Sequence, residues 1–414
     1  MSGNALTGMS ALVVDDEEFM LDFLCMAVEK SGVGHVFSAT SGAEALDQVE
    51  ERQQMIDIIV CDLQMPGMDG IEVIRQLAND GFSGGILLVS GDDKRVLKTA
   101  ESMAEVRGLK VIGSLCKPMP VHEIISLMNK YAVAEQDASW AISAVTANEL
   151  DAAIRSGEIT ANYQPQVDIK TGVVKSVEAL ARWFHPERGM ISPELFIDMA
   201  ERHDLIDSLA DSIIMQATRQ GAIWHKQGID LSVAINISMY NLRHLDFPDR
   251  ITDIVNQTGM DIKKLVIEIT ESRLIQDLGT YLDILSRLRL KGPLLSIDDF
   301  GTGYVSLDHL KQMPFGELKI DRAFVNGASK DDTARAILES SICLAKQLDM
   351  AAVAKGVEVK DDWNLVEALG CDMVQGYYVA PPMDVDTFEA WLLKGENKSS
   401  SRVDIKINPQ MNAE

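Results

Sequence analysis

The feature that most constrains the fold is a regular alternation of short apolar runs and amphipathic segments after about residue 148. The apolar runs have the length and composition of β-strands, and a helical segment separates most neighbours. The eight runs are residues 161–167, 176–183, 231–238, 264–270, 294–300, 317–321, 351–358 and 373–379. Eight strands with intervening helices over about 250 residues are typical of a (β/α)8-type barrel.

The first two of these runs lie on either side of a short turn, Lys170-Thr171-Gly172. A turn of this length favours an antiparallel hairpin. We therefore expect an antiparallel first strand, which departs from the regular barrel. The barrel domain is predicted over residues 148–395, and the polar residues 396–414 are predicted to form a disordered tail.

The N-terminal part of the chain has a different pattern. Residues 11–14, 57–61 and 86–90 are continuous apolar runs, as expected of parallel strands that are buried on both faces. A helical stretch follows each run. This pattern predicts a flavodoxin-like, doubly wound α/β domain over residues 1–133. The small and polar residues 134–147 are predicted to be a linker.

Composition excludes several classes of protein. The net charge of −25 argues against binding to DNA, whose phosphates are recognised by clustered Lys and Arg. No apolar run approaches the roughly 20 residues of a membrane span, and the N-terminus does not resemble a signal peptide. The five cysteines show no Cys-x-x-Cys spacing and are interpreted as reduced thiols. A cytoplasmic location is expected.

Polar side chains follow the strands of the N-terminal domain. Asp15 and Asp16 end its first strand, and Asp62 ends its third. Because the carboxyl ends of parallel strands converge, these carboxylates should meet, and Mg²⁺ would neutralise them. Ser90 and Lys117 end later strands and offer a hydroxyl and a cation to a phosphoryl group. The sequence therefore predicts a pocket in which an aspartate is the nucleophile.

These residues resemble the motifs of response-regulator receiver domains. The resemblance covers residues 9–132 and rests on Asp15-Asp16-Glu17, the run 62–70, Ser90 and Lys117-Pro118. It implies that Asp62 accepts a phosphoryl group from a histidine kinase or phosphotransfer protein, and that Asp15 and Asp16 help to bind Mg²⁺. One departure is Leu115, where many receivers carry an aromatic switch residue.

The predicted barrel strands also end in polar residues. Most strands contribute such a residue within an apolar run, where polarity is costly unless it is used. They are Glu178, Asn236, Glu268, Asp298, Asp299, Lys319, Asp321 and Gln375. In this architecture the active site lies at the carboxyl ends of the strands. Several carboxylates in one cavity indicate divalent metal, and a bridging aspartate would suit a two-metal centre for phosphodiester cleavage.

The barrel resembles the EAL domain, the cyclic di-GMP phosphodiesterase family, over residues 148–394. The matching motifs are 163–165, 178–183, 236–238, 268–271, 298–303, 319–321, 356–358 and 375–377. The resemblance implies hydrolysis of cyclic di-GMP to linear pGpG, with Mg²⁺ or Mn²⁺. It also implies a homodimer formed through the EAL domains.

The resemblance assigns roles residue by residue. The first metal would be held by Glu178, Asn236, Glu268 and Asp298, and the second by Asp298 and Asp299. Lys319 would position the attacking water, and Glu271 would brace the loop that contains Gly301 and Gly303. The dinucleotide pocket would be shaped by Gln164, Leu180, Arg182, Asp321, Glu358 and Gln375.

Lys355 is the departure that bears on activity. Family members that hydrolyse typically have Glu-Gly-Val-Glu where this chain has Lys355-Gly-Val-Glu358. A protonated lysine cannot ligate a metal, although a buried one can lose its proton. It can also pair with Asp298 or Asp299 in place of the second metal. Two interpretations stay open: a phosphodiesterase slowed by Lys355 or helped by Glu358, and a receptor that binds cyclic di-GMP without cleaving it.

Two other enzyme classes find little support. The pair His203-Asp204 could suggest an HD-type hydrolase, but it lacks the companion histidines of a metal site. No GGDEF-like run of a diguanylate cyclase is present. The order of the two domains suggests that phosphorylation of Asp62 controls the barrel.

Overall fold

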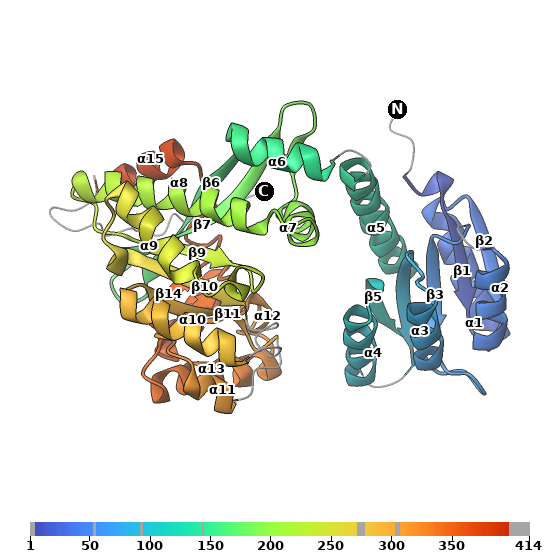
Figure 1. Ribbon diagram of the computed structural model, residues 1–414. Helices are drawn as coiled ribbons and strands as arrows, with labels where there is room; N and C mark the ends of the chain where they lie inside the picture. The colour runs from blue at the N-terminus through green and yellow to red at the C-terminus, as the bar shows by residue number, and fades with distance from the viewer. Residues whose placement is uncertain are drawn as a thin grey trace. The chain divides into compact units, whose positions relative to one another are not determined.

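The computed structural model describes residues 5–52, 55–91, 94–142, 145–270, 278–302 and 307–396 (Figure 1). The chain forms two compact units, Met1–Ala144 and Val145–Glu414. Each unit has its own buried apolar core.

The N-terminal unit is a parallel five-stranded sheet in the order β2-β1-β3-β4-β5. Its strands are β1 (Ser10–Val14), β2 (His35–Ala39), β3 (Ile58–Asp62), β4 (Gly85–Ser90) and β5 (Lys110–Cys116). Its helices are η1 (Ala5–Gly8), α1 (Glu18–Ser31), α2 (Gly42–Glu51), α3 (Gly70–Asn79), α4 (Lys94–Val106) and α5 (Val121–Ile142). A separate apolar cluster covers each face of the sheet. The predicted doubly wound fold is confirmed.

The strand order explains how the pocket of this unit is built. β1 and β3 are neighbours, so Asp15 and Asp62 follow or end adjacent strands. Every residue of β1, β3 and β4 is buried, which is why these strands are continuous apolar runs in the sequence. β2 is an edge strand with exposed and half-buried positions, and it has no such run.

The C-terminal unit is a closed barrel of eight strands. The order is β6-β14-β13-β12-β11-β10-β9-β7, and pairing of β6 with β7 completes the circle. The strands are β6 (Ile159–Asp168), β7 (Val174–His185), β9 (Ser232–Ile237), β10 (Leu265–Thr270), β11 (Leu294–Phe300), β12 (Glu317–Ile320), β13 (Ala351–Lys355) and β14 (Met373–Gln375). β6 is antiparallel to both of its neighbours, which confirms the predicted hairpin.

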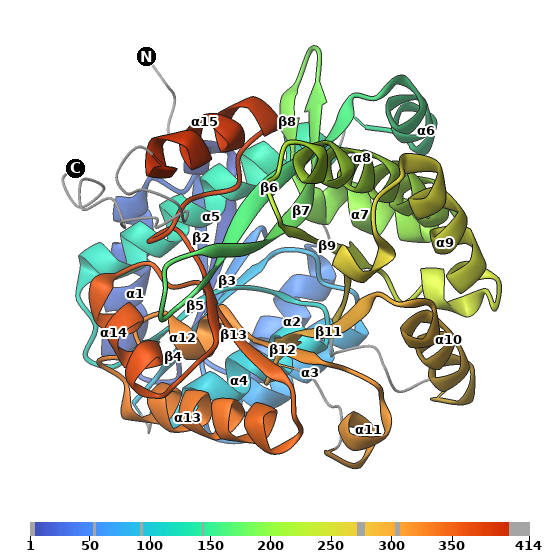
Figure 2. The same ribbon diagram turned by 90° about the vertical axis from the view of Figure 1, so that its left-hand side faces the viewer.

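Helices surround the strands on the outside of the barrel (Figure 2). They are α6 (Ala147–Ser156), α7 (Pro193–Arg202), α8 (Ile206–Lys226), η2 (Asn241–Arg243), α9 (Phe247–Thr258), η3 (Ile262–Lys264), α10 (Leu278–Lys291), α11 (Leu307–Gln312), α12 (Arg322–Val325), α13 (Asp332–Gln347), α14 (Lys360–Ala368) and α15 (Val385–Glu396). A short strand that the sequence did not predict, β8 (Gly189–Ile191), pairs with the end of β7.

Alternation along the strands separates an apolar layer from a polar interior. In β10, Leu265, Ile267 and Ile269 belong to the core beneath the helices. Successive side chains of a strand point to opposite faces, so Glu268 and Thr270 face the inside of the barrel. The same rule places Glu317 and Lys319 inside, because Leu318 and Ile320 belong to the outer core. The interior of the barrel is therefore where the polar side chains gather.

The stretch predicted as a linker is helical over its first part, since α5 continues to Ile142. The predicted disordered tail lies outside the described residues from 397 onward. Among the described helices, none combines the length and apolar character that a membrane span requires.

Candidate functional site

The pocket of the N-terminal unit is organised around Lys117. Its ammonium group donates hydrogen bonds to Asp15 Oδ2 at 2.7 Å and to Asp62 Oδ2 at 2.8 Å. Asp15 and Asp62 are buried, and Asp62 Oδ1 has no hydrogen-bond partner among the described residues. Burial raises the pKa of Asp62 in spite of Lys117. The predicted pocket residues thus lie together, with one carboxylate oxygen left for another ligand.

A divalent ion fits this pocket. Carboxylate oxygens of Asp15, Asp16 and Asp62 lie within 4.8 Å of one another, and Asp16 is exposed. Oxygen ligands of this kind suit Mg²⁺. Ser90 ends β4 and is buried. Leu115, at the position of the usual aromatic switch, is buried in the apolar core.

Lys319 is the centre of the barrel site. Its ammonium group is fully buried and donates to Glu178 Oε2 at 2.8 Å and to Glu268 Oε1 at 2.6 Å. Burial alone would lower the pKa of Lys319, but Glu178, Glu268 and Asp298 raise it well above its usual value. Lys319 therefore stays charged and ties two neighbouring carboxylates together.

Glu178 joins the two sides of the site. It accepts a hydrogen bond from Asn236 Nδ2 at 2.6 Å and another from Gln375 Nε2 at 2.7 Å. Burial alone would raise the pKa of Glu178, but the ammonium groups of Lys319 and Lys355 hold it below its usual range. Gln375 also donates to Gln164 Oε1 at 2.9 Å. Residues from four strands are thereby fixed in one network.

Lys355 is at the carboxyl end of β13 and binds both aspartates of β11. Its Nζ lies 2.7 and 2.9 Å from the two oxygens of Asp298 and 2.6 Å from Asp299 Oδ1. Burial and the charge of Lys319 would lower the pKa of Lys355, but Asp298, Glu178 and Asp299 raise it. Asp299 has a positive φ of 53°, a conformation that aspartate tolerates better than most residues. The lysine that departs from the usual glutamate is therefore held by an ion pair with both aspartates.

The remaining carboxylates fit one divalent ion. Oxygens of Glu178, Glu268 and Asp298 lie within 4.8 Å of one another, and all three residues are buried. Glu268 Oε2 is buried and has no hydrogen-bond partner among the described residues. Burial and repulsion from Glu178 raise the pKa of Glu268. A metal ion bound between these carboxylates would offset that repulsion and give Glu268 Oε2 a partner.

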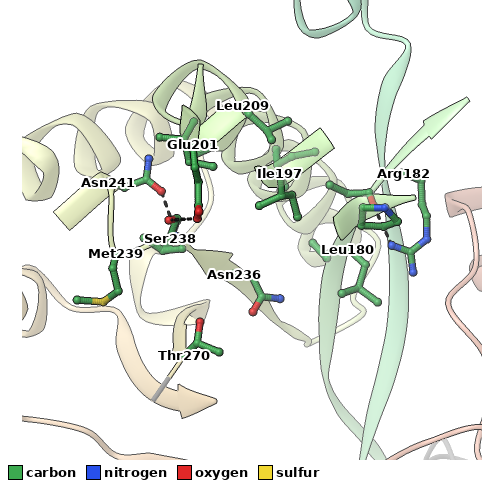
Figure 3. A pocket seen from close by; sticks show the side chains of 17 residues that line it. Leu180, Arg182, Ile197, Glu201, Leu209, Asn236, Ser238, Met239, Asn241 and Thr270 are labelled. Atoms are coloured by element: carbon green, nitrogen blue, oxygen red, sulfur yellow. Dashed lines mark hydrogen bonds between the residues drawn. The ribbon is translucent and has the colours of Figure 1, made fainter. Parts of the chain in front are cut away.

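A cavity of about 410 Å³ has Asn236, the hydrogen-bond donor to Glu178, in its lining (Figure 3). Asn236 and Arg182 line it near the strand ends, and Ile197 and Leu209 of α7 and α8 form apolar walls. Leu180 also lines it. At its far side Ser238 donates to Glu201 Oε1 at 2.6 Å. An apolar chamber with a few fixed polar groups suits a planar heterocycle joined to an anionic group near Arg182.

Other predicted residues lie at the edge of the site or outside the described chain. Asp321 caps α12 by accepting a hydrogen bond from the backbone N–H of Ala323, and Glu358 is exposed beyond β13. Glu271 and Gly303 lie outside the described residues, so their predicted roles have no structural account.

Several buried polar residues of the barrel interior were not among the predicted site residues, and Gln166 and Glu317 are two of them. Gln166 donates to Gln375 Oε1 at 3.1 Å, and Glu317 lies inside β12 two residues before Lys319. Burial raises the pKa of Glu317. The signal that could have found them is strand periodicity, since each lies two positions from a predicted site residue and therefore on the same face.

Two family models match this chain. The EAL domain model covers residues 147–382, and the response regulator receiver domain model covers residues 11–129. The cyclic di-GMP phosphodiesterase RocR of Pseudomonas aeruginosa is 33% identical over 388 residues, which are 92% of this chain and 98% of RocR. The cyclic di-GMP phosphodiesterase PA2567 of the same organism is 36% identical over 230 residues, or 56% of this chain and 39% of PA2567.

Solved structures are similar to this chain over a part of its length. The PaMucR phosphodiesterase in complex with c-di-GMP has a TM-score of 0.56 and 35% identity, covering 58% of this chain and 98% of that one. The EAL enzyme Bd1971 with cAMP and cyclic di-GMP bound has a TM-score of 0.57 and 31% identity, covering 64% of this chain and 73% of that one.

Proposed function

The chain belongs to the EAL domain family, with a response regulator receiver domain at its N-terminus, and on this premise we propose that its barrel binds cyclic di-GMP and hydrolyses it to linear pGpG. The observation that supports this most is the cluster of Glu178, Glu268 and Asp298 around Lys319 at the carboxyl ends of the strands. Active sites of such barrels lie at this face.

Glu178, Asn236, Glu268 and Asp298 would hold a Mg²⁺ or Mn²⁺ ion. A bound divalent ion would polarise a phosphoryl oxygen and lower the pKa of a coordinated water. Lys319 holds the carboxylates of Glu178 and Glu268 in place, and its charge would stabilise a hydroxide bound next to it. Hydrolysis breaks one P–O ester bond: the water gives OH to phosphorus and a proton to the leaving oxygen.

The dinucleotide would lie across the strand ends and the adjoining cavity. Arg182 is suited to a phosphate because a guanidinium offers several N–H donors, and Leu180 offers apolar contact to a base. Gln164 and Gln375 are already fixed by hydrogen bonds to each other. Asp321 and Glu358 lie at the rim, where they could accept hydrogen bonds from the N–H groups of guanine.

Abolishing the metal site should stop hydrolysis. We expect Glu268→Gln to lower pGpG formation by on the order of 10²-fold or more, because a ligand of the proposed metal loses its charge. The measurement is chromatography of products formed from cyclic di-GMP with Mg²⁺ or Mn²⁺. Glu367→Gln, on the exposed side of α14, is the matched control. Equal rates for wild type and Glu268→Gln would contradict the proposed role.

We also propose that phosphorylation of Asp62 controls the barrel, with a histidine kinase or phosphotransfer protein as donor and an EAL-mediated homodimer as the responding assembly. Asp62→Asn should abolish uptake of phosphate from a small phosphodonor, and turnover and ligand binding should then ignore the donor. Asp80→Asn, an exposed change in the same unit, should behave as wild type. Retained phosphate in Asp62→Asn would place the acceptor elsewhere.

A second candidate function is supported by Lys355. Because its ammonium group occupies Asp298 and Asp299, the protein could act as a cyclic di-GMP receptor that binds without cleaving and signals through a partner protein. Binding measured by calorimetry, together with no pGpG from wild type, would favour this function over hydrolysis.

A further inference from the structure

We propose that the ammonium group of Lys355 takes the place of a second divalent ion, so that the EAL site of this chain binds one metal ion instead of two. This inference rests on the proposed function and concerns how the same site is loaded. It assigns Lys355 as the residue that fixes the number of ions.

The hydrogen bonds of Lys355 are the first argument. All three donors of an ammonium group can be used here, since Nζ lies 2.6–2.9 Å from three carboxylate oxygens of Asp298 and Asp299. These two aspartates are the ligands that a second ion would need. The side chain of Lys355 is 20% exposed and that of Asp298 is 5% exposed. The Lys355–Asp298 pair is thus mostly shielded from solvent. Charges in such a shielded position are poorly screened.

The backbone holds Lys355 in this position. Gly356 follows it with φ of 74°, and a Cβ there would lie 2.5 Å from Arg322 Cβ. Val357 is fully buried, and its backbone N–H donates to the carbonyl of Gln375 at 3.2 Å. The end of β13 is therefore packed against its surroundings, and the lysine stem starts from a fixed point.

The balance of formal charge also indicates a single divalent ion. The two lysines of the site and the side chains that they bind form a cluster of four carboxylates, those of Glu178, Glu268, Asp298 and Asp299, and two ammonium groups. The surplus of two negative charges matches one divalent ion. Replacing Lys355 by glutamate would raise the surplus to four, which matches two. Glu317, two residues before Lys319 in β12, is not among the carboxylates that the two lysines bind.

A second ion would also meet direct repulsion. An ion bound to the oxygens of Asp298 and Asp299 would lie close to Nζ, and a double charge repels an ammonium group twice as strongly as a single charge does. Lys355 would have to break three hydrogen bonds before a second ion could bind. The geometry favours one ion next to Glu178 and Glu268, whose hydrogen-bonded ammonium group is that of Lys319.

The test is to count bound ions in the full-length protein without nucleotide. Equilibrium dialysis against Mn²⁺ with elemental analysis gives the ions per chain for wild type, Lys355→Glu, Lys355→Met and Lys360→Glu. Lys360 is an exposed lysine at the start of α14, so Lys360→Glu makes the same charge change outside the site. An ion in the receiver contributes equally to every variant and cancels in the differences.

We expect Lys355→Glu to bind one more ion per chain than wild type and Lys360→Glu to match wild type. Lys355→Met should admit the second ion with a weaker Kd, because the ammonium group is gone but no ligand replaces it. The inference is overturned if wild type already binds as many ions as Lys355→Glu, or if both Lys355 variants keep the wild-type number. If Lys355→Glu does not fold, the ion counts of wild type and Lys355→Met are enough to test the inference.

Because no nucleotide is present, this count is independent of turnover. Failure of the proposed function would appear separately, as absence of both cyclic di-GMP binding and pGpG formation in wild type and Lys355→Glu. An unchanged ion count with active wild type would overturn only the inference about Lys355.

Discussion

Replacing Lys319 by methionine should lower the free energy of unfolding of the barrel by about 3–5 kcal/mol. The substitution keeps most of the side-chain volume but removes the buried charge that Glu178 and Glu268 share at 2.8 and 2.6 Å. Both carboxylates are at most 4% exposed, so water cannot replace the lost partner. Breaking one side of a buried ion pair leaves the other uncompensated, which is the costly case.

Tryptophan fluorescence during urea unfolding can measure this loss, because four of the five tryptophans lie in the barrel unit: Trp183, Trp224, Trp363 and Trp391. The fifth, Trp140, is in α5, so a Trp140→Phe background makes the signal specific to the barrel. Lys311→Met, at an exposed site on α11, is the control and should shift the transition by no more than about 0.5 kcal/mol.

Added Mg²⁺ should restore more stability to Lys319→Met than to wild type, since a cation would then replace the missing ammonium group. A variant as stable as wild type would show that the two glutamates are neutral or hydrated in the folded protein.

Replacing Lys355 by glutamate should raise the rate of pGpG formation by on the order of 10²-fold or more, because a second metal ion supplies several kcal/mol of transition-state stabilisation. The substitution removes the ammonium group that binds Asp298 and Asp299 and adds a carboxylate at the end of β13. Single-turnover measurement of cyclic di-GMP cleavage at saturating Mn²⁺ would separate this chemical step from binding and product release.

Lys360→Glu should leave the rate of cleavage unchanged, because Lys360 is exposed outside the site. Lys355→Met should stay well below Lys355→Glu, since removal of the charge supplies no new ligand. A rate for Lys355→Glu at or below that of wild type would mean that the lysine takes part in cleavage, directly or by holding the aspartates.

Strand positions could be predicted from the sequence because both sheets are buried. A strand such as β10, buried at five of six positions, must be apolar except where a side chain is used, and Glu268 stands out against that background. Edge strand β2 lacks this contrast, and β8 is only three residues long, so neither has a clear signal.

The partners of individual side chains could not be predicted in the same way. Periodicity places Lys319 and Lys355 on the inner face of the barrel. Which carboxylate each lysine binds depends on the alignment of strands that are not adjacent. Lys319 binds Glu178 of β7 and Glu268 of β10, which are 141 and 51 residues away. The sequence left Lys355 either neutral or paired, and the short contacts to Asp298 and Asp299 favour the pair.

The pairing of the first barrel strand with the last one has a consequence for synthesis on the ribosome. Val167 of β6 pairs with Val374 of β14, the last strand of the barrel. At about 5–20 residues/s, translation of the intervening chain takes roughly 10–40 s, during which this edge of β6 has no partner strand. The N-terminal sheet pairs strands that are close in sequence and can fold during this interval. Nascent chains stalled before β14 should therefore carry a folded first domain and an open, chaperone-dependent second one.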